Sequence, residues 1–470
     1  MNMATSQDKN TIMKSLLSLI VALIVFHTFK LYDIDYQTRT KSENNSRLAK
    51  KRRKKKRVLW TDVNDRISDL QFRRMFRMTR DCFDLLCNTI IAGVGEKAFK
   101  SEAYIDAFLK GKNYMYDANV ATTGGYIAGE VKLAITLRLL AGGDALDIAV
   151  IFDVYAGHIG TIVYHVLSDW VKGLNIGKID ISKYLNDVNA MSIVSEGFAE
   201  RSNGVLKGAI GAIDGWLVRI RAPSWFSDRV SSPITFFSRK GFFALNVQCI
   251  VDDKKRVLWA SYSHKGASHD SSCLRETKLY SKLIEMKLKL YDLGFFLLGD
   301  SAYGIESFLI TPYDNTSPKT PQDDFNFYHS SARITVECAF GEIDLRWGIF
   351  WKRLNVSLEN AAILIEGAMH LHNFLVDYRE SKVVDKKLHT FIEREIFQNN
   401  LVDSGIIPLV VGEEGRDMGR PLNSEREWKL KGILKRDLLK TSLMDHGLTR
   451  PRKSDWLIDE HCHIIRTVNE

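Results

Sequence analysis

The spacing of apolar positions changes near residue 205. Between residues 60 and 175 apolar side chains recur at the helical interval of three or four. Examples are Leu70, Phe72, Phe76, Phe83 and Leu86. Residues 131–171 divide into three helices, because Gly142 and Gly143 end the first, Asp144 caps the second, and a turn through Gly157 leads to the third. Two short helices joined in this way resemble a helix-turn-helix.

The third of these helices has two interpretations. It carries His158, Thr161, Tyr164 and His165, but no Lys or Arg before Lys172. A recognition helix needs basic side chains to hold phosphates. Packing within a helical domain is therefore favoured over sequence-specific DNA reading.

From residue 205 to 375 short apolar runs replace the helical spacing. Strands are expected at 206–214, 217–222, 242–252 and 256–264, the last two joined by a tight turn through DDKK. A helix is expected over 271–294, then a short buried strand over 295–300 that ends at Asp300, then further helices. This order predicts an α/β fold with an RNase H-like catalytic core, a mixed sheet flanked by helices, behind an N-terminal helical, helix-turn-helix-like domain.

The pattern divides the chain into four segments. These are a tail over 1–58, a helical domain over 59–178, the α/β domain over 200–378, and a charged C-terminal tail over 379–470. The C-terminal tail contains a helix from about 423 to 447 with a capping box formed by Ser424 and Glu427. Its basic residues are expected either on a solvated face or at DNA.

The net charge of +9 has a local source. Residues 47–57 carry nine basic residues, Lys51, Arg52 and Arg53 among them, and no acid, so this run accounts for all of the net charge. Such a run is typical of a nuclear-import signal or a nucleic-acid contact, or of a solvated linker. The six cysteines are too scattered for a disulfide framework, which fits a reducing compartment.

An uncharged apolar stretch over residues 15–29 leaves the location of the protein open. Its 15 residues are fewer than the roughly 20 that a helix needs to span a bilayer. A secretory signal or membrane anchor, a partner-binding helix and a misread start of the gene all explain it. We expect a nuclear protein, with membrane association through residues 15–29 as the alternative.

Three acidic residues stand in settings that suit metal chemistry. Asp214 and Asp300 each follow a short apolar run, so we expect each at the end of a strand. Glu337 lies beside a helical stripe formed by Val336, Phe340, Ile343 and Trp347. Carboxylates fixed by rigid elements can hold two Mg²⁺ ions that cut a phosphodiester bond. A surface carboxylate or a salt bridge explains any one of these acids equally well.

Four segments together resemble the PIF/Harbinger superfamily of DNA transposases and their derived nucleases. They are GAIDGWLVRIRAP, FFSRKGFFALNVQCIVDDKKRVLWASYSHKGASHDSSCL, FFLLGDSAYGIESFLITPY and FNFYHSSARITVECAFGEIDLRWGIF. They occur in the family's order over about residues 208–354. LLAGGDALDIAVIF also resembles the helical region of the family.

The resemblance implies a DDE transposase or endonuclease. Asp214, Asp300 and Glu337 fall on the family's acidic triad, which binds divalent metal, Mg²⁺ or Mn²⁺, as two ions. Such enzymes cut DNA at terminal inverted repeats and join the freed 3′ ends to a target site. Many act with a separate Myb-like DNA-binding protein, and a homodimer is a further expectation. The alternative is a domesticated protein that binds DNA or a partner without cutting.

Further residues of the matching segments are secondary candidates. His269 and Asp270 match a recurrent family motif, and Asp270 is expected to support the metal site or the fold. Arg239, Lys240 and Arg333 are expected to contact DNA phosphates. Trp216 and Leu217 depart from the small residue and histidine that often follow the first acid.

Overall fold

The computed structural model describes one of the two units of the chain. The chain divides into Met1–Lys55 and Lys56–Glu470. Described residues are 58–96, 99, 127–224, 232–378, 423–451, 457–458 and 464–466. The apolar stretch over 15–29 and the basic run with Lys51, Arg52 and Arg53 lie outside these ranges, so the predictions about them stay predictions.

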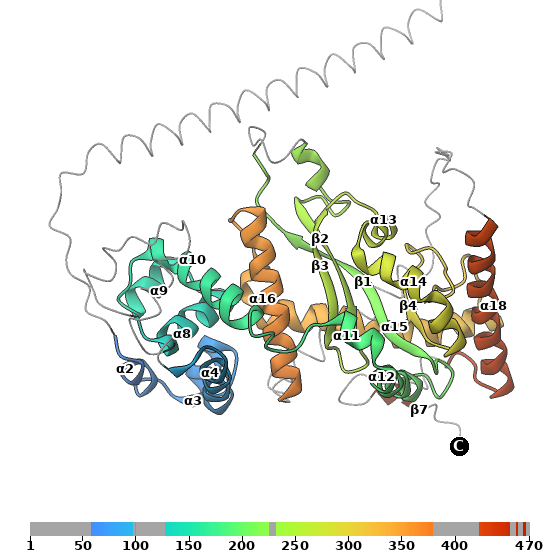
Figure 1. Cartoon of the computed structure of the whole chain (residues 1–470), viewed down its shortest axis with the longest axis horizontal. Coiled ribbons are helices and arrows are strands. Elements are labelled where there is room, and N and C mark those ends of the chain that lie inside the picture. Colours follow the sequence, from blue (N-terminus) through green and yellow to red (C-terminus); the bar gives the residue numbers. More distant parts are fainter. Residues whose placement is uncertain are drawn as a thin grey trace, which may run out of the picture. The chain divides into compact units, whose positions relative to one another are not determined.

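A five-stranded mixed sheet forms the centre of the α/β domain (Figure 1). Its strands are β1 (Ala209–Arg219), β2 (Ala244–Val251), β3 (Val257–Lys265), β4 (Phe296–Leu298) and β5 (Leu309–Ile310), in the order β3-β2-β1-β4-β5. β3, β2 and β1 are antiparallel, whereas β4 and β5 run parallel to β1. The predicted RNase H-like class, a mixed sheet flanked by helices, is confirmed.

The first strand is longer than the sequence pattern predicts. The two strands expected before and after Asp214 form one strand, because residues 215–219 continue to pair with β2 up to Arg219 opposite Ala244. Asp214 therefore lies inside a strand, and the prediction that it ends one is wrong. Its pairing with β4 stops earlier, at Ala212 opposite Leu298. Beyond that point β1 projects past the end of β4.

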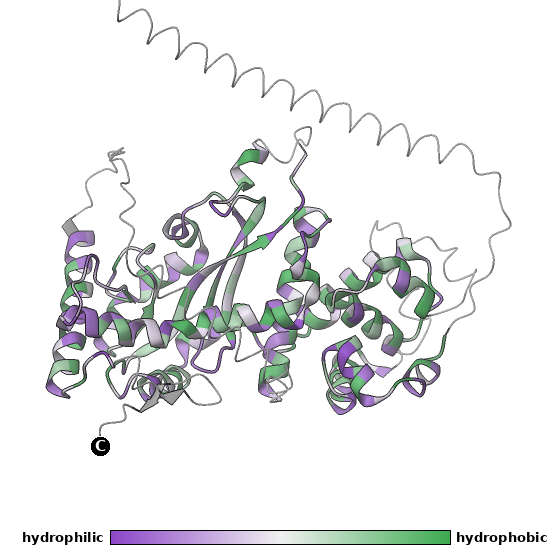
Figure 2. Cartoon of the chain, turned by 180° about the vertical axis from the view of Figure 1, so that it is seen from behind, coloured by the Kyte–Doolittle hydropathy of each residue, from purple (hydrophilic) through white to green (hydrophobic). Residues whose placement is uncertain are grey.

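Helices cover both faces of the sheet. Their bounds are α11 (Ile181–Asn186), α12 (Val188–Arg201), α13 (Asp270–Arg275), α14 (Lys278–Asp292), α15 (Pro321–Arg346) and α16 (Leu358–Asp377), with the short helices η2 (Pro233–Phe236) and η3 (Gly348–Trp351) between them. Ile213 and Ile250 share a buried cluster with Leu283 of α14. Cys249 shares another with Val336 and Ile343 of α15. Purple and green residues alternate along the helices, as expected for elements with one apolar face (Figure 2).

The helix expected over 271–294 is two helices. α13 ends at Arg275 and α14 begins at Lys278. Thr277 caps the second helix, since its side chain accepts a hydrogen bond from the backbone N–H of Tyr280 at 3.2 Å. A threonine at this position starts a new helix more readily than it continues an old one.

The helical region before the sheet has the predicted parts. They are α2 (Trp60–Asn64), α3 (Asp69–Phe76), α4 (Arg80–Val94), α8 (Gly129–Leu140), α9 (Ala145–Ile151), α10 (Ala156–His165) and the π-helix η1 (Val166–Lys172). Asp144 caps α9 by accepting from the N–H of Leu146 at 2.8 Å, as expected. No helix of the described ranges is alone long and apolar enough to cross a membrane. One bent pair, Ala145–Ile151 with Ala156–Lys172, passes that test by length and composition.

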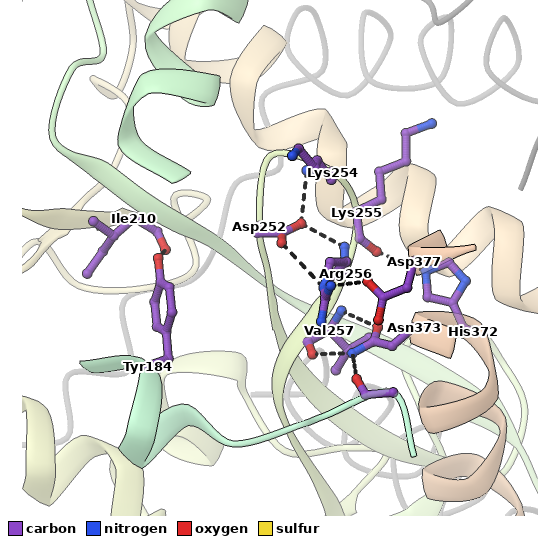
Figure 3. A network of polar contacts seen from close by, with 11 residues as sticks. Tyr184, Ile210, Asp252, Lys254, Lys255, Arg256, Val257, His372, Asn373 and Asp377 are labelled. Carbon is purple, nitrogen blue, oxygen red and sulfur yellow. Dashed lines mark hydrogen bonds and ion pairs between the residues drawn. The ribbon is translucent and has the colours of Figure 1, made fainter. Parts of the chain in front are cut away.

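α16 secures the edge of the sheet (Figure 3). The Asn373 amide accepts from the N–H of Val257 at 2.7 Å and donates to its carbonyl at 2.8 Å, as a neighbouring strand would. It also donates to the carbonyl of Gly177 at 2.9 Å. The ring of His372 donates from Nε2 to the carbonyl of Lys255 at 2.8 Å. This helix thereby joins the loop after η1 to the β2–β3 turn.

The C-terminal helix α18 (Asn423–Asp445) packs on the other edge of the sheet, against β5 and α15. The Arg436 guanidinium lies 3.9 Å from the ring centroid of Tyr313 and donates to the Pro312 carbonyl at 3.0 Å. Lys431 lies 4.0 Å from the ring of Trp428. Basic side chains of α18 are thus partly committed to aromatic rings of the protein itself. A two-stranded sheet of β6 (Leu457–Ile458) and β7 (Ile464–Arg466) follows.

Candidate active site

The three predicted acids come from three elements that meet where β4 ends. Asp214 lies on the part of β1 that projects past β4. Asp300 follows β4, separated from it by Gly299 alone. Glu337 lies inside α15, which packs against β1, β2 and β4. The structure therefore brings together three carboxylates that are 123 residues apart along the chain from first to last.

Arg333 lies among these carboxylates. Its Nη1 is 2.9 Å from Oδ2 of Asp214, and its Nη2 is 2.5 Å from Oε1 of Glu337. Arg333 and Glu337 are four residues apart on α15, a spacing that places two side chains on the same face of a helix. The sequence predicted a DNA contact for Arg333, whereas the structure places its guanidinium on the triad.

Burial and like charges set the protonation of Asp214. Burial raises the pKa of Asp214 to about 7, and the charges of Asp300 and Glu337 act in the same direction. Arg333 and the N–H of Gly215, which donates to Oδ1 of Asp214 at 2.7 Å, oppose this rise. Conversely, burial lowers the pKa of Arg333, but the charges of Glu337, Asp214 and Asp300 outweigh it and raise that pKa above its usual value. The four groups form one electrostatic unit.

Asp300 connects the triad to the exposed basic residues. Burial raises the pKa of its carboxyl, and so does the charge of Asp270, while Arg333 and Arg239 lower it. Its Oδ1 accepts from the N–H of Ala302 at 3.0 Å. Arg239 and Lys240 are exposed, in the turn between η2 and β2. Of the predicted phosphate contacts, these two are placed at the surface.

Asp270 is held by amides from the sheet. Its Oδ1 accepts from Nδ2 of Asn246 and from Nε2 of Gln248, both at 2.8 Å. Oε1 of Gln248 in turn accepts from the hydroxyl of Tyr303 at 2.5 Å. A Cβ on Gly215 would lie 2.4 Å from Asp270 Oδ1, so only glycine leaves room for this carboxylate. We refer to Asn246, Gln248, Asp270 and Tyr303 as the polar clamp.

The polar clamp and Asp214 lie on opposite faces of the sheet. Residues directly opposite in an antiparallel pair share a face. Gly215 pairs with Gln248, whereas Asp214 pairs with Cys249. Asp270 therefore lies across the sheet from Asp214, and its charge acts on Asp300. His269 is the exposed residue at the N-cap position of α13, and its Nδ1 is hydrogen-bonded to the Ser271 hydroxyl at 2.9 Å.

The clamp residues Asn246, Gln248 and Tyr303 were missed by reasoning from the sequence. A signal was present, because Asn246 and Gln248 are the two polar side chains in the otherwise apolar run ALNVQCIV, two residues apart and hence on one face. Both are buried. Trp216, a departure from the family pattern, stacks on Phe340 of α15 with ring centroids 5.7 Å apart, so it is partly buried against the core.

The donor set of the triad fits a hard divalent cation in its chemistry. Three carboxylates supply the oxygen ligands that Mg²⁺ and Mn²⁺ prefer. In the arrangement seen, the Arg333 guanidinium lies on Asp214 and Glu337. Among the described residues no three His, Cys, Asp or Glu side chains are spaced to hold one metal ion as they stand. The ligands are therefore present, and a cation of the protein itself is paired with two of them.

Part of the chain is similar to known proteins. Residues 213–373 match the family of DDE superfamily endonucleases, and this segment contains all three acids. An Arabidopsis thaliana protein named "Protein ALP1-like" is 24% identical over 331 residues, 67% of this chain and 73% of that protein. A Mus musculus protein named "Putative nuclease HARBI1" is 26% identical over 181 residues, 37% of this chain and 47% of that protein. No solved structure matches the chain significantly.

Proposed function

We propose that this protein is a DNA endonuclease of the transposase type, because residues 213–373 match the DDE superfamily endonucleases and the chain is a distant relative of the Harbinger-derived nucleases. It cuts phosphodiester bonds at the ends of a mobile element and joins the 3′ ends to target DNA. The observation that carries the proposal is the convergence of Asp214, Asp300 and Glu337 at the end of β4.

The triad residues would hold two Mg²⁺ or Mn²⁺ ions, which activate a water or 3′-hydroxyl and stabilise the leaving oxygen. Asp214 must be ionised for this, and its pKa of about 7 puts that change close to neutral pH. β1 and α15 fix Asp214 and Glu337 from two sides, which limits the reorganisation needed at the reacting phosphate. The low-dielectric surroundings strengthen every charge interaction there.

DNA binding is assigned to residues around the triad and to the basic run. Arg239 and Lys240 are exposed neighbours, and the charge of Arg239 acts on Asp300, which supports assigning DNA phosphate contacts to this pair. Residues 47–57 would add sequence-independent affinity and direct the protein to the nucleus. The third helix of the helix-turn-helix-like region lacks Lys and Arg before Lys172. Recognition of the element's ends would therefore fall to a separate Myb-like partner or a homodimer.

The test begins with the genome. Short inverted repeats bordered by a target duplication, on either side of the coding region, would identify the element and supply the substrate. The purified protein should then cut a duplex carrying these ends in Mg²⁺ or Mn²⁺, and Asp214→Asn and Asp300→Asn should each abolish cutting while DNA affinity persists. DNA binding without cleavage in either metal would show a binding protein instead. A tagged full chain that stays in a carbonate-washed membrane pellet would overturn the nuclear assignment.

A further inference from the structure

Arg333 uses the oxygen atoms that a metal ion at the triad would need. Both oxygens of Asp214 have partners: Oδ2 pairs with Arg333 at 2.9 Å, and Oδ1 accepts from the Gly215 N–H at 2.7 Å. The Gly215 N–H belongs to the backbone of β1 and is fixed. The Arg333 side chain ends in a guanidinium on a flexible stem. Of the two partners, Arg333 is the one that can leave.

The guanidinium and a divalent cation exclude one another at this position. Arg333 has a side-chain exposure of 12%, and Asp214 and Glu337 have 18% and 15%. Two cations on the same largely buried carboxylates would repel one another strongly, because little water screens them. Conversely, the three carboxylates repel one another when no cation lies between them. The three carboxylates are therefore neutralised either by the Arg333 guanidinium or by a divalent cation, and not by both at once.

We propose that Arg333 is an internal counter-cation that changes partners during metal loading. The divalent ions displace its guanidinium from Asp214 and Glu337, and the guanidinium then pairs with a phosphate of the bound DNA. A guanidinium suits both partners, since its planar fork matches carboxylate and phosphate equally. The inference rests on the proposed function, because it takes the triad to be the metal site.

This exchange makes metal and DNA binding cooperative. Without DNA, a metal ion must break two charge-assisted hydrogen bonds of Arg333 that nothing replaces. With DNA, the phosphate replaces them, so metal binds more tightly. By reciprocity, metal must strengthen DNA binding by the same factor. Metal would thus load efficiently only when a substrate phosphate is in place.

The test measures Mn²⁺ binding to the full chain by calorimetry, with and without a short DNA duplex of arbitrary sequence. Arg333→Gln should bind Mn²⁺ at least about tenfold more tightly than the unaltered protein in the absence of DNA, because the guanidinium no longer competes through its two charge-assisted hydrogen bonds and one of them alone is worth about that factor. The duplex should tighten Mn²⁺ binding to the unaltered protein but not to Arg333→Gln. Asp214→Asn should lose the site.

The matched control is Arg353→Gln, which removes the same charge from an exposed arginine that has no assigned part in metal or DNA binding. Its Mn²⁺ affinity should change by less than about threefold, as for an exposed charge. An equal rise of the Mn²⁺ affinity in both variants would show that Arg333 acts only through its charge at a distance, and would overturn the exchange. So would an Arg333→Gln affinity equal to or weaker than that of the unaltered protein.

Two further outcomes are separated by design. If Arg333→Gln does not fold, Arg333→Lys keeps the charge but cannot bridge both acids, and its Mn²⁺ affinity should rise by about threefold; no rise would overturn the exchange. If the unaltered protein shows no Mn²⁺ site that depends on Asp214, the proposed function fails. If that site exists and the Arg333 variants do not tighten it, the exchange alone fails.

Discussion

The substitution Gln248→Ala tests the polar clamp beside the triad. Gln248 is fully buried and joins three partners: it donates to Asp270 at 2.8 Å and to Asn246 at 2.9 Å, and accepts from Tyr303 at 2.5 Å. Alanine removes all three hydrogen bonds. Tyr303 is 2% exposed, so its hydroxyl would have no access to bulk water.

The expected cost follows from which partners can find replacements. Asp270 keeps its bond from Asn246, so its loss is partial. The Tyr303 hydroxyl and the Asn246 oxygen lose a buried partner, at about 1–3 kcal/mol each. The truncation also leaves a small cavity. Together these effects should lower the free energy of unfolding by about 3 kcal/mol.

Urea denaturation of the full chain, followed by circular dichroism, measures this loss. Gln322→Ala, the same substitution at a half-exposed position in the first turn of α15, is the control and should change stability by less than about 0.5 kcal/mol. A Gln248→Ala loss below about 1 kcal/mol, or one equal to that of the control, would refute the clamp. The variant also distinguishes the two roles expected for Asp270, support of the metal site and support of the fold. Weaker Mn²⁺ binding would place Asp270 in support of the metal site, and unchanged binding would leave it to the fold.

Two further predictions concern pH and the edge of the sheet. Since burial raises the pKa of Asp214 to about 7, a proton competes with the metal ion below that pH. The Mn²⁺ affinity measured by calorimetry should therefore fall about tenfold per pH unit from pH 7 to 5.5 and level off above about pH 7. An affinity that does not change with pH over this range would contradict the prediction. The same raised pKa means that the stability from Asp214 is present below pH 4 or so and is lost as the pH rises to about 7. Asn373→Ala removes the amide that bonds to the Val257 N–H and to the Val257 and Gly177 carbonyls. The free energy of unfolding, measured by urea denaturation, should fall by about 4 kcal/mol. The same substitution at an exposed asparagine should lower it by less than about 1 kcal/mol.

The sequence predicted the fold class because apolar periodicity is a local property. The pattern placed Glu337 on a helix beside a buried stripe, and Glu337 does lie on the helix α15. It failed at Asp214, where the apolar run ends but the strand does not. β2 continues to supply partners as far as Ala244 opposite Arg219. Strand ends depend on the neighbouring strand, which a local pattern does not contain.

The ion pairs and hydrogen bonds of the site could not be predicted from local sequence patterns for the same reason. Arginine is a residue type that often contacts phosphates, but the partner of Arg333, Asp214, lies 119 residues away along the chain. The partners of Asp270 likewise come from β2, 22 and 24 residues before it. Asn246 and Gln248 could have been found as polar residues on a buried strand. Their function as donors to Asp270 required the three-dimensional arrangement.

Metal-dependent DNA cleavage by Glu337 and the two aspartates is the function that we propose. The most direct measurement compares Glu337→Gln with Asp344→Asn in Mg²⁺-dependent cutting of a duplex that carries the element's ends. Both acids lie on α15, two turns apart. The charge of Glu337 acts on Asp214, whereas the charge that acts on Asp344 is that of Arg219. Glu337→Gln should lose about a thousandfold or more in rate, while Asp344→Asn keeps most of it. Equal rates in the two variants would contradict the account.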